Sequence, residues 1–309
     1  MKHGWLILLF TLSCSDPAAR NTLRTQSDGQ KSVVPEPSEE NSSSGDSATA
    51  PVPNPVPDNK TQVPPTEENG TSVELEVKGI SCSSSAVIAK TKKICEATVQ
   101  GIKVKFVPLA EGVKVSRLAF YLHGDTAADW KNPFVVAPFV EWAASKQILL
   151  VMPLSTARYE DDKEGDQSYG AAQPEDAEKL AKLVGEFVAA YKTPSDNLLY
   201  FGTSGGPWFM ASSYIPVVGG RYPGLFALSC GASTFWQKAL WSYKDSSIRS
   251  KIKIFFNYGD KDFLLSGEEK SYAYYETQGF VVSKKVYPGA THCNHDVTNA
   301  TIAFWEANM

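Results

Sequence analysis

One serine of the sequence has the surroundings of an activated nucleophile. Ser204 lies in Gly202-Thr203-Ser204-Gly205-Gly206, which fits the pattern G-x-S-x-G. Glycines on both sides let a serine occupy a sharp turn between a strand and a helix, because they remove side chains that would clash. The apolar run 198–201 precedes this turn, and Pro207 suits the first turn of a following helix. This context favours a nucleophile over an ordinary glycine-rich turn.

A serine nucleophile needs a base, and four histidines are present. His3 lies in the N-terminal leader, and His123 ends an early strand. His292 and His295 follow the last expected strand, so either could reach the serine. Both could instead be surface loop residues.

A base of this kind also needs a carboxylate that holds the imidazole in one tautomer. Asp260 and Asp262 follow the apolar run 252–256, and both qualify by position. Asp260 could alternatively cap its own turn.

The elements that must position these residues alternate between strand and helix from residue 73 onward. The runs 73–77 and 102–106 alternate with period two, which predicts half-exposed antiparallel strands. Short apolar runs predict buried parallel strands at 118–122, 148–152, 198–201, 225–229, 252–258 and 281–287. Helices are expected at 134–146, 175–191, 205–215, 266–278 and 296–308. The pattern predicts an α/β fold, a mostly parallel sheet with helices on both faces. The connection 154–173 is unusually long, so it is either a solvated excursion or part of the site mouth.

The N-terminus has a different character. Residues 1–14 combine Lys2 with a short apolar core that ends at Cys14, which predicts a secretory signal. The cysteine resembles the lipidation site of bacterial lipoproteins, although Thr11 stands where leucine is usual. The alternative is an ordinary cleaved signal. We therefore expect export to the bacterial cell envelope, with the protein lipid-anchored to a membrane or secreted.

Residues 15–72 contain nine prolines, nine serines and no aromatic residue, which predicts a disordered linker between the signal and a domain at 73–309. The 309-residue chain has a net charge of −4, and residues 73–309 carry no net charge. This balance argues against nucleic acid as a partner, because phosphate contacts require a basic surplus.

Five cysteines are present, and four remain if Cys14 is lipidated. In an exported protein this number allows two disulfides, and the pairings Cys82–Cys95 and Cys230–Cys293 are favoured. Metal binding is the weaker interpretation of these cysteines, because the sequence contains no paired Cys-x-x-Cys spacing.

The order Ser…Asp…His with a G-x-S-x-G turn resembles the alpha/beta hydrolase superfamily over about residues 98–309. The resemblance is to serine esterases of the dienelactone hydrolase, feruloyl esterase and polyester depolymerase kind. It implies Ser204, Asp262 and His292 as a triad, because Gly259 precedes Asp262 by three residues and 287–292 resembles the closing histidine segment. It also implies an oxyanion hole from the backbone N–H groups of Asp125 and Gly205, with His123 shaping that loop. Thr203 precedes the serine where feruloyl esterases and tannases carry a cysteine, so Cys230 is the possible substitute partner of Cys293.

The implied activity is hydrolysis of small or polymeric carboxylic esters, with no metal or organic cofactor. A serine peptidase of the same fold and a catalytically silent binding lipoprotein are the alternatives. Four aromatic residues could line an apolar substrate pocket: Trp208, Phe235, Trp236 and Trp241.

Overall fold

The computed structural model describes residues 81–84, 93–159, 166–233 and 245–309, which belong to one unit, Asn69–Met309. Several predictions fall outside the described residues. They are the signal 1–14 with Cys14, the linker 15–72, the strand 73–77, and Phe235, Trp236 and Trp241.

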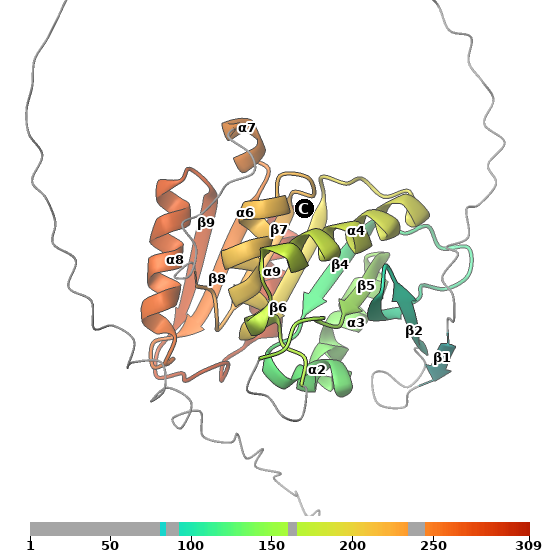
Figure 1. Ribbon diagram of the computed structural model, residues 1–309, viewed down its shortest axis with the longest axis horizontal. Helices are drawn as coiled ribbons and strands as arrows, with labels where there is room; N and C mark the ends of the chain where they lie inside the picture. Colours follow the sequence, from blue (N-terminus) through green and yellow to red (C-terminus); the bar gives the residue numbers. More distant parts are fainter. Residues whose placement is uncertain (1–80, 85–92, 160–165, 234–244) are drawn as a thin grey trace, which may run out of the picture. The chain divides into compact units, whose positions relative to one another are not determined.

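A nine-stranded sheet of order β1-β2-β3-β5-β4-β6-β7-β8-β9 forms the centre of this unit (Figure 1). Strands β1, β2, β3 and β5 pair antiparallel, whereas β5, β4, β6, β7, β8 and β9 pair parallel. The α/β fold with a mostly parallel sheet is therefore confirmed. The strands are β1 (Ser81–Ser84), β2 (Lys93–Val99), β3 (Ile102–Val107), β4 (Arg117–Leu122), β5 (Ile148–Pro153), β6 (Leu198–Thr203), β7 (Gly224–Ser229), β8 (Lys253–Gly259) and β9 (Val281–Tyr287).

Strand β3 was predicted at 102–106, but its hairpin partner β2 was missing from the sequence prediction, although β2 carries a recognisable signal. Glu96 and Thr98 are exposed while the residues around them are buried, as in a strand with one face in the core. The connecting residues Gln100 and Gly101 both have positive φ, 50° and 77°. Positive φ at both positions matches the twist of a two-residue hairpin turn.

Helices cover both faces of the sheet (Figure 1). Helices α4, α5, α6 and α8 pack on one face around Phe187, Phe209 and Tyr275, and α3 and α9 pack on the other around Phe139 and Trp305. The helices are α2 (Ala128–Lys131), α3 (Ala137–Ser145), α4 (Pro174–Tyr191), α5 (Gly205–Phe209), α6 (Ile215–Val218), α7 (Ser246–Arg249), α8 (Leu265–Thr277) and α9 (Val297–Asn308).

The helix expected at 205–215 is not regular. A π-helical segment, Met210–Tyr214, separates α5 from α6. Pro216 lacks an N–H group and its ring would clash with the carbonyl four residues earlier, so a regular α-helix cannot continue through it. The Gly219 amide donates both to the Tyr214 carbonyl, five residues back, at 3.0 Å and to the Ile215 carbonyl at 3.2 Å.

The parallel strands place the candidate residues at one edge of the sheet. Strands β4, β6, β7, β8 and β9 run in the same direction, so their carboxyl ends meet there. In open α/β sheets this edge is where ligands bind. The segments that follow these five strands carry His123, Ser204, Cys230, Asp262 and His292.

Candidate active site

Ser204 occupies the turn between β6 and α5 with φ 53° and ψ −112°. A side chain at either flanking glycine would collide with β4. A Cβ at Gly202 would lie 2.4 Å from the Leu122 carbonyl oxygen, and one at Gly206 would lie 2.1 Å from it. The two glycines therefore let β4 approach closely enough to hold the serine in this strained turn.

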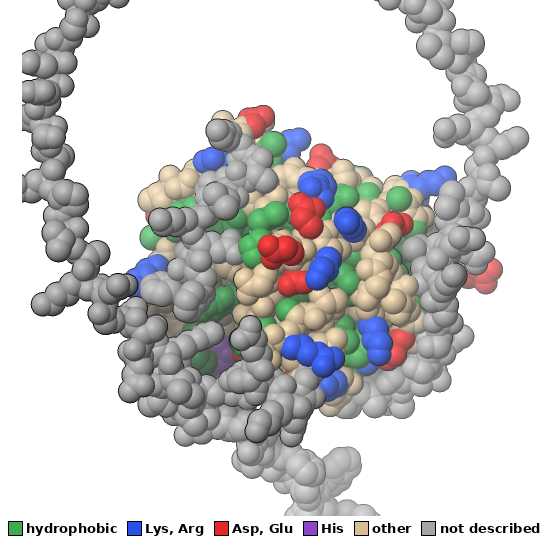
Figure 2. All heavy atoms as spheres, in the orientation of Figure 1, with side chains coloured by type: hydrophobic (Ala, Val, Ile, Leu, Met, Phe, Trp, Pro, Cys, Tyr) green, Lys and Arg blue, Asp and Glu red, His purple; other side chains and the backbone are tan. Residues whose placement is uncertain are grey.

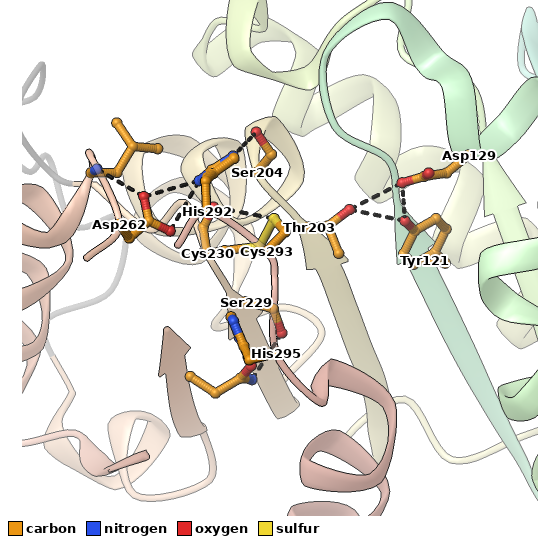
Figure 3. Close-up of a disulfide and its surroundings, with 12 residues drawn as sticks. Tyr121, Asp129, Thr203, Ser204, Ser229, Cys230, Asp262, His292, Cys293 and His295 are labelled. Atoms are coloured by element: carbon orange, nitrogen blue, oxygen red, sulfur yellow. Dashed lines mark hydrogen bonds and ion pairs between the residues drawn. A yellow bond between two sulfur atoms is a disulfide. The ribbon is translucent and has the colours of Figure 1, made fainter. Parts of the chain in front are cut away.

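Ser204, His292 and Asp262 form one hydrogen-bonded chain (Figure 3). The Ser204 hydroxyl lies 3.1 Å from His292 Nε2. On the other side of the ring, His292 Nδ1 lies 3.0 Å from each Asp262 carboxylate oxygen. In this arrangement Nδ1–H donates to the carboxylate, which leaves Nε2 free to accept the serine proton.

The two candidate aspartates have different surroundings. The Asp262 side chain is fully buried, and its Oδ1 also accepts a hydrogen bond from the Leu264 amide at 2.9 Å. Asp260 instead accepts from the Gly289 amide at 2.6 Å and ties the loop after β8 to the loop after β9. Asp262 therefore lies in position to orient the imidazole, and Asp260 caps a loop.

The two candidate histidines are separated in the same way. His295 Nε2 lies 3.0 Å from Asn257 Oδ1, and its ring stacks on Tyr287 with centroids 4.6 Å apart. Burial lowers the pKa of His295 and keeps the ring neutral. His295 thus fills a structural position next to β8, and its hydrogen bond goes to Asn257, whereas the Ser204 hydroxyl bonds His292.

Disulfides fix two places in the described chain. Cys230, directly after β7, is bonded to Cys293, the neighbour of His292, with the Cα atoms 5.2 Å apart. This bond fastens the histidine loop to the end of β7. Cys95 in β2 is also disulfide-bonded, and Cys82 lies directly opposite it in β1.

The expected oxyanion donors lie at the starts of a short turn and a helix. Asp125 begins a short turn, Asp125–Ala127, and Gly205 begins α5. The first amides of a helix have no partner within it, so the Gly205 amide can donate elsewhere. A Cβ at Gly124 would lie 3.2 Å from the Ser204 Cβ, which places this segment directly beside the serine.

His123 is fully buried under the same segment. Its Nδ1 lies 2.7 Å from the Gly124 carbonyl oxygen, and its Nε2 accepts from the Ser155 amide at 3.0 Å. Burial lowers its pKa to about 4, so the ring is neutral at neutral pH. His123 therefore shapes the loop and has no free nitrogen with which to act as a base.

No pattern in the sequence predicted the polar cluster that joins this loop to the turn at Ser204. Asp129 Oδ2 accepts from the Tyr121 hydroxyl at 2.6 Å and from the Thr203 hydroxyl at 3.1 Å (Figure 3). Thr203 is the neighbour of Ser204, so α2 is tied directly to the nucleophile turn. Burial raises the pKa of the Tyr121 hydroxyl and keeps it protonated as a donor.

Glu268 in α8 is a further residue near the site that the sequence analysis did not predict. Its residue exposure is 1%, and no hydrogen bond of normal geometry reaches either carboxyl oxygen from the described residues. Burial and the charge of Asp262 raise its pKa to about 9, although the Gly231 amide opposes this shift. Glu268 is therefore a neutral acid beside the charged one.

Of the predicted pocket residues, Trp208 is the one described. It lines a pocket of about 190 Å³ together with Phe263 and Leu264. The Phe263 ring also packs on the His292 ring, with centroids 4.5 Å apart. This pocket therefore adjoins the histidine, and its remaining lining residues are Ser233, Ser266, Gly267 and Lys270.

The surface in Figure 2 shows basic and acidic side chains interspersed on the face that α4 crosses. Two ion pairs involve residues of α4, Arg221–Glu178 and Lys179–Asp176. Within the described ranges, no group of three or more His, Cys, Asp or Glu could hold a metal ion. No helix in this part of the chain has the length and apolarity needed to span a membrane.

Comparisons with known proteins identify the fold. No family model and no curated protein matches the chain. Among solved structures, a carboxylesterase of Bacillus cereus is 15% identical with a TM-score of 0.51, covering 67% of this chain and 94% of that one. An esterase/lipase from an uncultured bacterium is 14% identical with a TM-score of 0.50, covering 70% and 84%. This likeness, together with the sheet order and the strand–turn–helix at Ser204, shows that the chain has the α/β hydrolase fold.

Proposed function

We propose that this protein is a serine hydrolase that cleaves carboxylic esters through an acyl-enzyme on Ser204. The hydrogen-bonded chain from Ser204 through His292 to the buried Asp262 is the observation that carries the proposal. A nucleophile, a base and a carboxylate that orients the base are the groups that acyl transfer requires. The fold supports the same class of reaction by analogy.

In the first half of the reaction, His292 Nε2 removes the Ser204 proton as Oγ attacks the ester carbonyl carbon. The tetrahedral intermediate then collapses, the bond to the alcohol oxygen breaks, and the imidazolium returns its proton to the leaving alcohol. The Asp262 carboxylate stabilises the imidazolium while it exists.

The negative charge that develops on the carbonyl oxygen needs donors fixed in advance. We assign this role to the backbone N–H groups of Asp125 and Gly205, which open a short turn and α5 beside Ser204. Each such donor is typically worth about 10²–10³ in rate.

In the second half, His292 takes a proton from water as the water attacks the acyl carbon. The Ser204–acyl bond then breaks, the carboxylic acid leaves, and Ser204 regains its proton from the imidazolium. The pocket at Trp208 and Phe263 adjoins the histidine and offers an apolar surface for part of a small or polymeric ester.

The test is hydrolysis of a panel of short-chain, aryl and polyester substrates and of peptides, by the wild type and by Ser204→Ala. We expect ester cleavage and stoichiometric labelling by an organophosphonate, both abolished in Ser204→Ala. Ser247→Ala, an exposed serine, is the matched control. Cleavage of peptides alone would identify a peptidase, and no turnover or labelling in the wild type would favour a binding protein.

We further propose that Cys14 anchors the protein to a bacterial membrane through a lipid and that residues 15–72 hold the domain away from it. The short apolar leader ending in cysteine supports this placement. Cells that make Cys14→Ala should release the protein from the membrane fraction. Unchanged membrane association of that variant would contradict lipidation.

A further inference from the structure

The proposed oxyanion segment has a strained backbone. Thr126 and Ala127, directly after Asp125, have φ values of 64° and 51°. Neither is glycine, and consecutive non-glycine residues seldom adopt this left-handed conformation. Such strain persists only where the surrounding structure enforces it, and it gathers at functional sites.

The structure that surrounds this segment comes from the long connection after β5. We define the brace as residues 154–159 and 166–171. The Ser155 amide donates to His123 Nε2 at 3.0 Å, and the Ser155 hydroxyl donates to the Ser168 carbonyl at 2.9 Å. Arg158 pairs with Gln167, which closes the two parts of the brace on each other.

Ser168 is the point at which the brace reaches the oxyanion segment. Its side chain donates to Asp125 Oδ1, and its Oγ in turn accepts from the Gly170 amide at 2.9 Å. The Tyr159 hydroxyl lies 3.4 Å from the same Asp125 oxygen. Ser168 is 1% exposed, so its hydroxyl is shielded from water, whereas the Asp125 carboxylate that it holds is exposed.

The same contact lies against the second proposed donor. A Cβ at Gly205 would lie 2.7 Å from Asp125 Oδ1 and 2.7 Å from the Gly170 nitrogen. The carboxylate of Asp125 and the backbone of the brace therefore converge on Gly205. One cluster of contacts fixes both amides relative to each other.

We propose that Ser168 is a positioning residue that holds the Asp125 and Gly205 amides in the geometry required to stabilise the oxyanion, and that the brace exists to place it. The proposal rests on the proposed esterase function. The Asp125 carboxylate contributes as the acceptor of the Ser168 hydrogen bond. Its negative charge does not contribute, because a negative charge does not stabilise an oxyanion.

The main test compares Ser168→Ala with Thr156→Ala, an exposed residue of the same brace that bonds Asp176. We expect Ser168→Ala to lower kcat about 10- to 100-fold while KM changes little, because an oxyanion contact acts in the transition state. Affinity for a boronate that mimics the oxyanion should fall by a similar factor. Thr156→Ala should leave both quantities within about twofold.

Charge and hydrogen bonding are separated at Asp125. Asp125→Ala should lose activity as Ser168→Ala does, and the double variant should lose no more than either alone, because both remove the same contact. Asp125→Asn should recover most of the kcat that Asp125→Ala loses, since an amide oxygen can still accept. An additive double variant, or an Asn variant as poor as Ala, would overturn the proposal.

A measurement independent of turnover separates this proposal from the esterase function. Amide hydrogen exchange over residues 124–128 should accelerate in Ser168→Ala and not in Thr156→Ala. Faster exchange in a protein that hydrolyses no ester would support the role of Ser168 in positioning residues 124–128 and would reject the esterase function. Unchanged exchange and unchanged kcat in an active esterase would reject the role of Ser168.

Discussion

The two halves of the candidate site are held by different means. In the acid–base half, the His292 loop is bonded covalently to β7 through Cys293 and Cys230. In the oxyanion half, residues 123–129 depend on hydrogen bonds made by the buried side chains of His123 and Ser168, and their backbone is strained. The comparison indicates two separate weaknesses. Reduction should disturb the acid–base half, and acid should disturb the oxyanion half.

Removing the base should have the largest effect. His292→Ala should lower kcat/KM about 10⁵–10⁶-fold, because serine and histidine act as one unit. His295→Ala should keep most of the activity and cost about 1–2 kcal/mol of stability through its lost contact with Asn257. The assay is kcat/KM on one short-chain ester, and a reversed ranking would move the base to His295.

Neutralising the acid should come next. Asp262→Asn should lower kcat about 10⁴-fold, since the imidazole loses the partner that fixes its tautomer. Asp260→Asn retains an oxygen that can accept from the Gly289 amide, so we expect a change in kcat below about threefold. The same ester assay decides between them, and a large loss at Asp260 alone would make it the acid.

Breaking the Cys230–Cys293 disulfide should have a moderate effect on both rate and stability. The bond closes a segment of 63 residues, for which the chain-entropy model gives about 4 kcal/mol. Cys230→Ser/Cys293→Ser should therefore lower Tm, and kcat should fall about tenfold as the His292 loop shifts.

The double variant Cys82→Ser/Cys95→Ser is the matched control, because β1 and β2 lie at the opposite edge of the sheet. It should lose stability while kcat stays the same. Equal loss of kcat in both double variants would mean that the disulfide beside His292 has no special role in the site.

Acid should test the oxyanion half. The pKa of His123 is lowered from its ordinary value of 6.5 to about 4, so the unfolded chain binds the proton first as pH falls. Stability should therefore decrease as pH drops from about 6.5 towards 4, by at most about 1.4 kcal/mol per pH unit. Urea unfolding at several pH values should give a flatter dependence for His123→Gln. Parallel curves for the two proteins would contradict this role.

Much of the fold and the positions of the triad candidates could be predicted because they leave local patterns. Buried strands appear as apolar runs, and parallel strands bring their carboxyl ends to one edge. The strand predicted as buried at 281–287 is the exception, because β9 lies at the edge of the sheet and is mostly exposed. That reasoning placed Ser204 near both candidate histidines and both candidate aspartates. It could not separate Asp262 from Asp260, because both follow the same strand; the resemblance favoured Asp262, and only long-range contacts distinguish the two.

The parts that escaped prediction depend on single polar contacts between distant segments. Ser168 reaches Asp125 across 43 residues, and Asp129 reaches Thr203 across 74. Such pairs have no periodicity, and the residue types are common in loops. The unusual length of the connection 154–173 was compatible with a role at the site, but its composition did not predict which residues it contacts.

Folding at neutral pH is coupled to the uptake of a proton at Glu268. At neutral pH the folded chain binds a proton at this carboxyl that the unfolded chain has released, because the pKa rises from 4.5 to about 9. Unfolding therefore ejects a proton into the solvent, and stability falls as pH rises between these values. The heat absorbed on unfolding must then depend on the ionisation enthalpy of the buffer that captures it. In Glu268→Gln this buffer dependence should be smaller by one proton.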